Sequence, residues 1–281
     1  ETMGTSAEGR NIPLLVLGDP LPASPRDLKH DPRPVIYIQA NIHAGEIEGK
    51  EAVQMLARDI LLEEDLNYLD NLILLLAPIF NPDGNEKLSP DNRRDNGPEL
   101  AGIRYNSMNL DLNRDAIKQE SPEMQGLTAN VLNTWDPLLL VDCHTTNGSY
   151  HIEPVTYVWP LNPNGDRSII SYMRGTMMNK VDEILEDEYG ILSIPYGNFT
   201  GRSFPPTVWR PAGPQPRYLT NYIGLRNRFS ILLENYAHAD YKTRVQGNYH
   251  FLLAVLDYCM DHGDEMAGLA APSKLYGAMA A

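Results

Sequence analysis

The chain has 281 residues, of which 42% are hydrophobic, and it carries a formal net charge of −14. This length can bury the core of one large domain, and we expect a single domain over residues 1–281, with 263–281 as an exit or tail. The acidity excludes the basic stripe that nucleic-acid binding normally needs. The longest apolar stretch, residues 72–80, is interrupted by Pro78 and is far too short to span a bilayer.

The first strong element is the apolar run Val35 to Ala40, which predicts a buried β-strand. It leads into a short loop with His43, and Glu46 then opens a stretch that is predicted to be helical over residues 47–61. A His and a Glu three residues apart are weak evidence alone, because the pair is common by chance. However, a strand end followed by a helix start is where open α/β sheets bind ligands.

Two later strands end in the same way. The run 137–141 predicts a strand that residues 145–148 break, so His144 lies at its end. The run 229–233 places Glu234 at another strand end, where apolar neighbours raise the pKa of a carboxyl group. Two imidazoles and a carboxylate are what a catalytic zinc ion takes from a protein, with a fourth position left for water. The pattern therefore indicates metal-assisted hydrolysis.

The remaining elements predict an α/β fold. Helices are expected at 122–135, 167–187 and 243–262, alternating with apolar strands. This order indicates a three-layer α/β/α sandwich with a mixed, mostly parallel central sheet. Two passages rich in proline and glycine, 81–111 and 194–216, are too long to be simple connections, and loops of that length usually line a site.

Six segments in order along the chain resemble the M14 family of zinc carboxypeptidases, and the resemblance extends from Gly4 to His262. The segments are Gly4–Arg10, His43–Glu46, Asn81–Gly84, Asp111–Arg114, His144 and Glu234. The resemblance implies the zinc carboxypeptidase fold. It also implies an enzyme that releases the C-terminal residue of a peptide.

Carried over residue by residue, the resemblance implies that His43, Glu46 and His144 bind one zinc ion per chain. Glu234 would be the general base, taking a proton from the attacking water and passing it to the departing amine. Cys143, beside a ligand, is expected to be a small core residue of its strand rather than a ligand or part of a disulfide framework.

The segment Asp111–Arg114 would hold the substrate. Asn113 and Arg114 match the pair that binds the terminal carboxylate of a peptide, a role that suits an amide and a planar guanidinium fork. Asp111 matches the carboxylate that orients one of the ligand histidines.

Two further roles have more than one candidate. Arg104 precedes Asn113 by a spacing like that of the cytosolic-type and aspartoacylase-like branches, whereas Arg94 better matches the pancreatic-type branch. We favour Arg104 as the residue that stabilises the oxyanion. Tyr218 and Tyr222 are both candidates for the tyrosine that closes over substrate, and we select Tyr222.

Three functions are compatible with these residues. A metallocarboxypeptidase acting on peptides is favoured, and the alternative is a zinc amidase or deacylase acting on cell-wall peptides or N-acyl amino acids. A catalytically silent peptide-binding module is disfavoured, because no ligand or base is missing. The preference for one C-terminal residue over another is expected to depend on side chains such as Asp142, Arg217, Leu219 and Arg226.

The compartment depends on what precedes the chain. The sequence begins with Glu1 rather than methionine, so we expect that an upstream segment was removed or left out. Removal of a signal peptide would place the protein in the periplasm or outside the cell. Otherwise it would be cytoplasmic.

Overall fold

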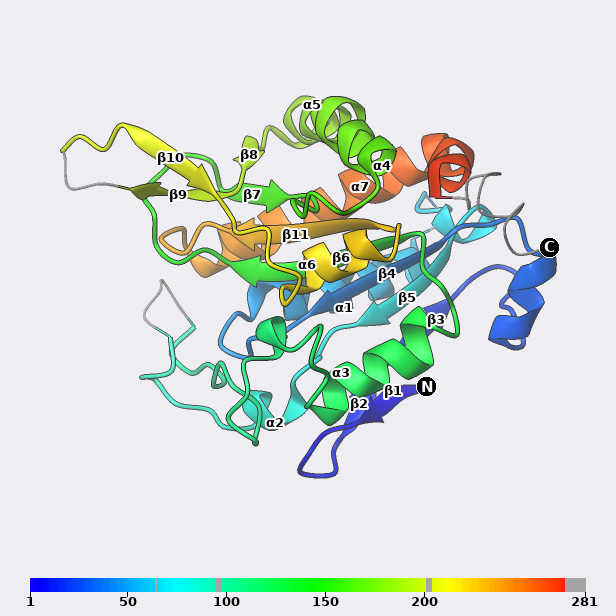
Figure 1. Ribbon diagram of the computed structural model, residues 1–281, viewed down its shortest axis with the longest axis horizontal. Helices are drawn as coiled ribbons and strands as arrows, with labels where there is room; N and C mark the ends of the chain where they lie inside the picture. The colour runs from blue at the N-terminus through cyan, green and yellow to red at the C-terminus, as the bar shows by residue number, and fades with distance from the viewer. Residues whose placement is uncertain (64, 94–97, 201–203, 271–281) are drawn as a thin grey trace.

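The computed structural model describes residues 1–63, 65–93, 98–200 and 204–270. A seven-stranded sheet in the order β3-β5-β4-β6-β11-β7-β8 runs through the centre of the molecule (Figure 1). Its strands are β3 (Leu15–Leu17), β4 (Val35–Ala40), β5 (Ile73–Ala77), β6 (Leu139–Thr145), β7 (Val155–Val158), β8 (Ser193–Pro195) and β11 (Phe229–Asn235). Four of the strand pairings are parallel and two are antiparallel. The predicted mixed, mostly parallel sheet is therefore confirmed.

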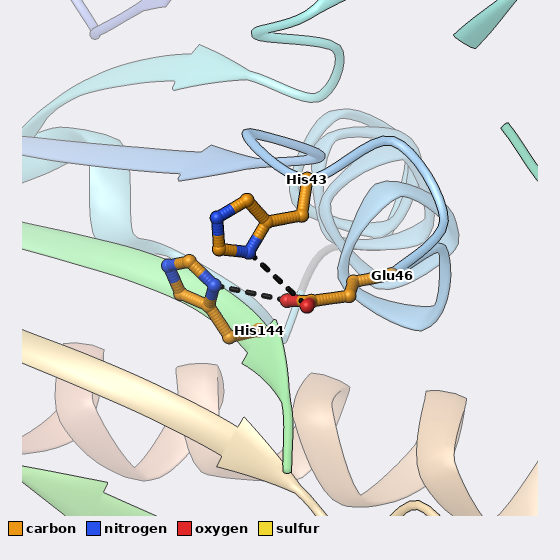
Figure 2. A group of neighbouring side chains, drawn as sticks. All are labelled: His43, Glu46 and His144. Carbon is orange, nitrogen blue, oxygen red and sulfur yellow. Dashed lines mark hydrogen bonds and ion pairs between the residues drawn. The ribbon is translucent and has the colours of Figure 1, made fainter. Parts of the chain in front are cut away.

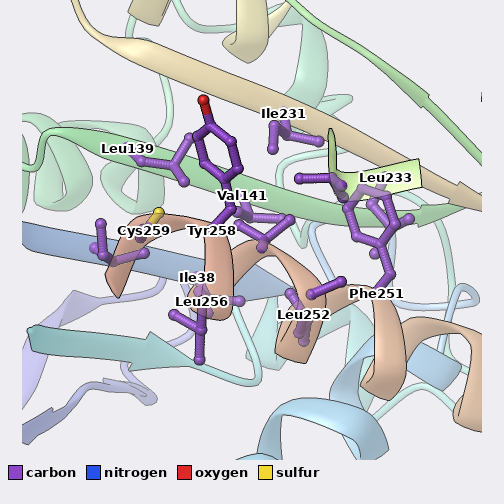
Figure 3. Close-up of a cluster of buried hydrophobic side chains, with 14 of the residues drawn as sticks. Ile38, Leu139, Val141, Ile231, Leu233, Phe251, Leu252, Leu256, Tyr258 and Cys259 are labelled. Carbon is purple, nitrogen blue, oxygen red and sulfur yellow. The ribbon is translucent and has the colours of Figure 1, made fainter. Parts of the chain in front are cut away.

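Long helices cover one face of this sheet. They are α1 (Glu48–Leu62), α4 (Arg167–Tyr172), α5 (Met178–Tyr189) and α7 (Tyr241–Ala270), with the π-helical segment Met173–Met177 between α4 and α5. Alternate residues of β11, such as Ile231 and Leu233, pack against Phe251 and Leu252 of α7 (Figure 3). Because each fully buried side chain of this size stabilises the fold by roughly 1.5–3 kcal/mol, this face supplies much of the core.

Shorter elements cover the other face. They are the hairpin of β1 (Thr2–Thr5) and β2 (Asn11–Pro13), α3 (Pro122–Gly126) with its π-helical continuation Leu127–Leu132, and α6 (Leu219–Leu225). Met3, Ile12, Leu127 and Leu219 from these elements belong to one hydrophobic core cluster with Tyr37 of β4. The α/β fold is thus confirmed, with a second layer of hairpin and short helices. Among the described helices, none is both long and apolar enough to cross a membrane.

The predicted long loops contain regular structure. The passage 194–216 holds β9 (Gly197–Thr200) and β10 (Val208–Pro211), which form a hairpin that projects from the body of the molecule (Figure 1). Only one residue of these two short strands is buried, so they lack the apolar alternation by which a strand is recognised in sequence. The passage 81–111 includes the one-turn helix α2 (Pro82–Asn85).

The last helix is longer than the sequence pattern predicts. It continues beyond His262 to Ala270, and Met266 on its last turns is fully buried in the core. Part of the segment 263–281 that was expected to be an exit or tail therefore packs with the rest of the molecule.

Candidate metal centre and active site

The candidate site lies on the sheet face opposite α7. In β6, Val141 and Cys143 pack in the core under α7, so Asp142 and His144 point to the other face. His144 and Glu234 are register partners at the carboxyl ends of the parallel strands β6 and β11. Since neighbouring strands lie about 4.8 Å apart, pairing alone brings these two side chains together.

His43 and Glu46 approach His144 from the adjacent strand. His43 lies in the loop after β4, where its carbonyl accepts a hydrogen bond from the Glu46 amide (2.9 Å). Figure 2 shows the side chains of His43 and Glu46, from the loop before α1, converging with that of His144 from β6. His43 Nδ1 is 3.1 Å from Glu46 Oε1, and His144 Nδ1 is 2.9 Å from Glu46 Oε2.

This triad fits a zinc ion. One ligand atom from each residue lies within 4.8 Å of the other two, and the exposed fractions of His43, Glu46 and His144 are only 3–4%. Two ligands bonded to a tetrahedral zinc ion at about 2.0–2.2 Å lie about 3.4 Å apart. The observed separations are close to this value, and the donor set of two imidazoles and a carboxylate is one that zinc takes.

Each histidine is oriented from its other side by a carboxylate. His43 Nε2 is 3.1 Å from Asp111 Oδ1, and His144 Nε2 is 2.8 Å from Asp142 Oδ2. Asp142 is fully buried and accepts a second hydrogen bond from Gln39 Nε2 (3.0 Å). Both contacts favour a proton on Nε2, which leaves the Nδ1 lone pair for a metal.

The electrostatics of the triad favour a bound cation. Burial alone would raise the pKa of Glu46, but His43, Arg93 and His144 outweigh it and hold the pKa well below its usual value. Burial alone would lower the pKa of His144, but Asp142 and Glu46 outweigh it and raise the pKa. The carboxylate of Glu46 is therefore ionised and presents negative charge to a cation.

Glu234 has the properties of a general base. Its side chain is 8% exposed, and its Oε2 has no hydrogen-bond partner within the part of the chain that the structure describes. Burial, with help from Glu46 and Asp142 and against His144, raises its pKa to about 8. A base that titrates near neutral pH can both accept and return a proton.

Arg104 lies against the triad. Its Nη1 is 3.2 Å from His43 Nδ1 and 3.5 Å from Glu46 Oε1, while Nε and Nη2 donate to Asp111 Oδ2 (3.1 and 2.9 Å). The backbone beside it is fixed by Gly84, whose carbonyl accepts from the Ile103 amide (2.9 Å). A Cβ at position 84 would lie 2.7 Å from the Ile103 carbonyl oxygen, so only glycine allows this approach.

The neighbouring Asp83 joins two of the sequence motifs. Its carboxylate, fully buried, accepts hydrogen bonds from Ser6 Oγ (2.6 Å), the Glu8 amide (2.9 Å), Arg10 Nη1 (2.8 Å) and Ser107 Oγ (2.6 Å). The motif 4–10 and the motif 81–84 therefore meet at one carboxylate, which ties the N-terminal hairpin to the loop that carries Arg104.

Asn113 and Arg114 lie on the same side of the site. Asn113 Oδ1 accepts from the Leu219 amide (3.0 Å), and its Nδ2 is 3.5 Å from His144 Nε2. The Arg114 guanidinium lies 4.5 Å from the ring centroid of Tyr218 and donates to the Asn113 carbonyl (2.8 Å). A cation and an amide held in this way can bind a carboxylate.

One cavity of about 280 Å³ brings most of the predicted residues together. Its lining includes His43, Glu46, His144, Glu234, Arg104, Asn113, Arg114 and Tyr218. Asp111 stands behind them, bonded to His43 and Arg104.

Some predicted residues are elsewhere. Tyr222 does not line this cavity: its hydroxyl contacts Gln119 Nε2 (3.2 Å) and Arg226 Nη1 (3.4 Å), and its ring packs against the core of the second face. Tyr218 directly precedes α6 at the cavity, whereas Tyr222 lies within α6, about 6 Å further along the helix axis (~1.5 Å per residue), where it contacts the core of the second face. The alternative Arg94 lies outside the described residues.

Two residues in the site have no role in the sequence prediction. Arg93 Nη1 donates to Glu46 Oε1 (2.7 Å) and Nη2 donates to the carbonyls of Thr145 and Thr146 (3.1 and 3.0 Å). Tyr196 lines the cavity, and its hydroxyl accepts from Asn147 Nδ2 (3.2 Å). Tyr196 follows a three-residue strand in a passage without periodicity, so only its side-chain type could have drawn attention to it.

Comparisons with known proteins agree with this geometry. The family model for zinc carboxypeptidases, Peptidase_M14, matches residues 1–137. No curated protein matches the chain.

Solved structures match over nearly the whole chain. A metallo-carboxypeptidase from Burkholderia cenocepacia is 17% identical, with a TM-score of 0.65 over 92% of this chain and 63% of that one. A metallo-carboxypeptidase from Pseudomonas aeruginosa, in complex with (2-guanidinoethylmercapto)succinic acid, is 19% identical, with a TM-score of 0.64 over 94% and 64%. Carboxypeptidase A from Helicoverpa armigera is 16% identical, with a TM-score of 0.61 over 98% and 69%. The fold is therefore that of metallo-carboxypeptidases, although the chain spans less than two thirds of the two bacterial proteins.

Proposed function

We propose that the chain, whose residues 1–137 match the model of the M14 family of zinc carboxypeptidases, is a zinc-dependent metallocarboxypeptidase that hydrolyses the C-terminal peptide bond of peptides. One observation carries the proposal: a single cavity contains the His-Glu-His triad, a buried carboxylate and an arginine–asparagine pair. The first two are suited to hydrolysis, and the third is suited to a substrate that ends in a free carboxylate.

His43, Glu46 and His144 would hold the zinc ion, with Asp111 and Asp142 fixing the two rings. When bound, zinc supplies a Lewis acid that acidifies a water molecule and polarises the scissile carbonyl group. Glu234 Oε2 accepts a proton from the attacking water and then donates it to the departing amine.

The arginines and tyrosine act on substrate. Arg114 and Asn113 bind the terminal carboxylate, which places the last peptide bond beside Glu234. Arg104, through Nη1, stabilises the negative charge that develops on the carbonyl oxygen. Tyr196 has the role of the tyrosine that closes over substrate, which the sequence prediction gave to Tyr222. Burial and the nearby Glu234 raise its pKa, so it remains a neutral donor at the cavity.

The first test combines metal content with substrate choice. Elemental analysis is expected to give about one zinc per chain. The protein should cleave N-acyl dipeptides that end in a free carboxylate, and their C-terminal amides should be poor substrates. Glu234→Gln should keep the zinc and lose at least about 100-fold in kcat, whereas the exposed Glu183→Gln should behave as wild type.

Other outcomes would change the assignment. Failure to bind zinc after reconstitution would reject the ligand triad. Bound zinc with cleavage of the acyl group, rather than of the last peptide bond, would favour the amidase or deacylase alternative. If the wild-type protein binds peptides without cleaving them, and Glu234→Gln binds them equally well, a binding module would be favoured.

A further inference from the structure

The cavity has a second wall, of which the proposed chemistry uses only Tyr196. Val158, Tyr196 and Leu232 form a small hydrophobic cluster of their own, separate from the two main cores, with Leu161 and Ala212 packed against it. All five residues line the cavity. We call this cluster the apolar wall.

The sheet register places the apolar wall next to Glu234. Leu232 precedes Glu234 by two residues in β11, so both side chains point to the same face of the sheet. Val158, the last residue of β7, is the register partner of Leu232. A cross-strand pair of apolar side chains therefore lies one strand repeat, roughly 7 Å, behind the candidate base.

No charged side chain belongs to the apolar wall. Within the described part of the chain, the charged residues that line the cavity are His43, Glu46, Arg104, Arg114, His144 and Glu234. Each of these already binds metal, carboxylate or the reacting groups in the proposed mechanism. A lysine, arginine, aspartate or glutamate side chain directed at the apolar wall would thus find no opposite charge there.

The amide groups nearby are also occupied. Asn221 Oδ1 accepts from the Leu161 amide (2.7 Å), and its Nδ2 donates to the carbonyls of Gly213 (2.9 Å) and Gln215 (3.2 Å). Asn198 Oδ1 accepts from Ser149 Oγ (2.6 Å). These groups hold the wall in place rather than offering partners to a ligand.

The side chains suspected from sequence of setting the preference do not reach the cavity. Asp142 is buried against His144, and Leu219 is buried in the core of the second face. Arg217 lines a different cavity, and Arg226 donates to Asn133 Oδ1 (2.8 Å). Among the described residues, the apolar wall remains as a cavity surface that can contact the terminal side chain.

We propose that the apolar wall is the specificity surface, and that the protein selects C-terminal residues with an uncharged, apolar side chain. This inference rests on the proposed function. When the substrate carboxylate binds Arg114 and the scissile bond lies beside Glu234, the side chain of the terminal residue faces Leu232 and Val158.

Binding to a protein that cannot turn over tests the inference apart from catalysis. Zinc-loaded Glu234→Gln is titrated by calorimetry with N-acyl-glycyl dipeptides that end in leucine, glycine, lysine or glutamate. We expect the leucine peptide to bind at least about tenfold more tightly than the other three, because it alone buries an apolar side chain without burying a charge. Equal affinities, or tighter binding of the lysine or glutamate peptide, would overturn the inference.

Hydrolysis by the wild-type protein separates this inference from the proposed function. Selective binding of the leucine peptide without any hydrolysis would reject the proposed function and leave the specificity surface standing. Hydrolysis with a preference for charged terminal residues would support the proposed function and reject the apolar wall as the specificity surface.

Three substitutions locate the selectivity in the wall. Leu232→Ala, and Val158→Ala as a second variant, should lower the leucine-to-glycine affinity ratio about fivefold or more. Leu233→Ala is the matched control, because Leu233 is the next residue but points into the core under α7. The ratio does not depend on the fraction of protein that folds. An unchanged ratio in both wall variants would contradict the proposal.

Discussion

The cavity has two walls that are held in place by different forces. The polar wall consists of the triad, Glu234, Arg104 and the Asn113–Arg114 pair, and hydrogen bonds and ion pairs to groups such as Asp111 and Asp142 fix its side chains. The apolar wall of Val158, Tyr196 and Leu232 is held mainly by packing and by the register of β7 and β11.

This difference predicts how each wall responds to substitution. Hydrogen bonds and metal ligation depend steeply on distance and angle. A single substitution on the polar wall should therefore weaken either zinc binding or binding of the substrate carboxylate. Burial of apolar surface is not directional. A change on the apolar wall should therefore alter selectivity while zinc binding remains.

The largest effect is expected at a ligand. His144→Ala removes one donor of the triad and leaves Glu46 and Asp142 facing each other across the gap. We expect the zinc affinity to fall by more than about 100-fold, as measured by competition with a chromogenic chelator. Leu232→Ala should keep the wild-type zinc affinity, and a similar loss in both variants would erase the distinction between the walls.

The next effect is expected at the anchor. Arg114→Ala should raise KM for free-carboxylate substrates by about 10- to 100-fold, because a hydrogen bond to a charged group is worth about 1.5–3 kcal/mol. Amidated substrates should be affected less. Arg217→Ala is the matched control, since Arg217 also contacts the Tyr218 ring (5.3 Å) but does not line the cavity. Equal losses in the two variants would argue against Arg114 as the anchor.

A smaller effect is expected behind the ligands. Asp142→Asn leaves one acceptor oxygen where Gln39 and His144 each need one, so the asparagine amide must face a donor. We expect the zinc affinity to fall by about 10- to 100-fold, measured in the same competition assay. Asp257 of α7 provides the control. It is partly buried and accepts a hydrogen bond from Tyr68 Oη, and Asp257→Asn should not change the zinc affinity.

The smallest effect is expected where the polar wall is attached to the N-terminal hairpin. Burial alone would raise the pKa of Asp83, but hydrogen bonds from Ser107, Ser6 and Arg10 hold it below its usual value. A lowered pKa stabilises the fold above the unfolded-state pKa of about 3.9, and this contribution disappears as the pH falls through the folded-state pKa.

Asp83→Asn should therefore reduce the free energy of unfolding by about 1–3 kcal/mol at pH 7. The difference from wild type should shrink below about pH 4. Urea unfolding at the two pH values measures it, with the exposed Asp91→Asn as the control. A difference that stays constant with pH would mean that the charge of Asp83 is not involved.

Much of the fold could be read from periodic patterns. The predicted strand Val35–Ala40 appears as β4 with the same bounds, and the helix predicted at 47–61 appears as α1, shifted by one residue. These elements are long and mostly buried, so their apolar pattern is strong. The β9–β10 hairpin was missed because its short strands carry no such pattern.

The residues of the candidate site also fall into those that local sequence predicts and those that it does not. His43, Glu46 and Glu234 stand in local motifs at predicted strand ends, and the structure brings them together at one cavity. Tyr196 and Arg93 could not be selected, because nothing in their local sequence reports that distant segments bring them to Glu234 and Glu46.

The sequence by itself determined the alternation of apolar strands and helices and the residue types at the strand ends, because these are local properties that a period of two or 3.6 residues records. Only the tertiary structure decided which side chains from distant segments come together on one face of the sheet. The apolar wall is the clearest case: Val158, Tyr196 and Leu232 are far apart in the chain, and the pairing of β7 with β11 brings two of them together. Strand register is a non-local property, and here it determines which side chains face the terminal residue of a substrate.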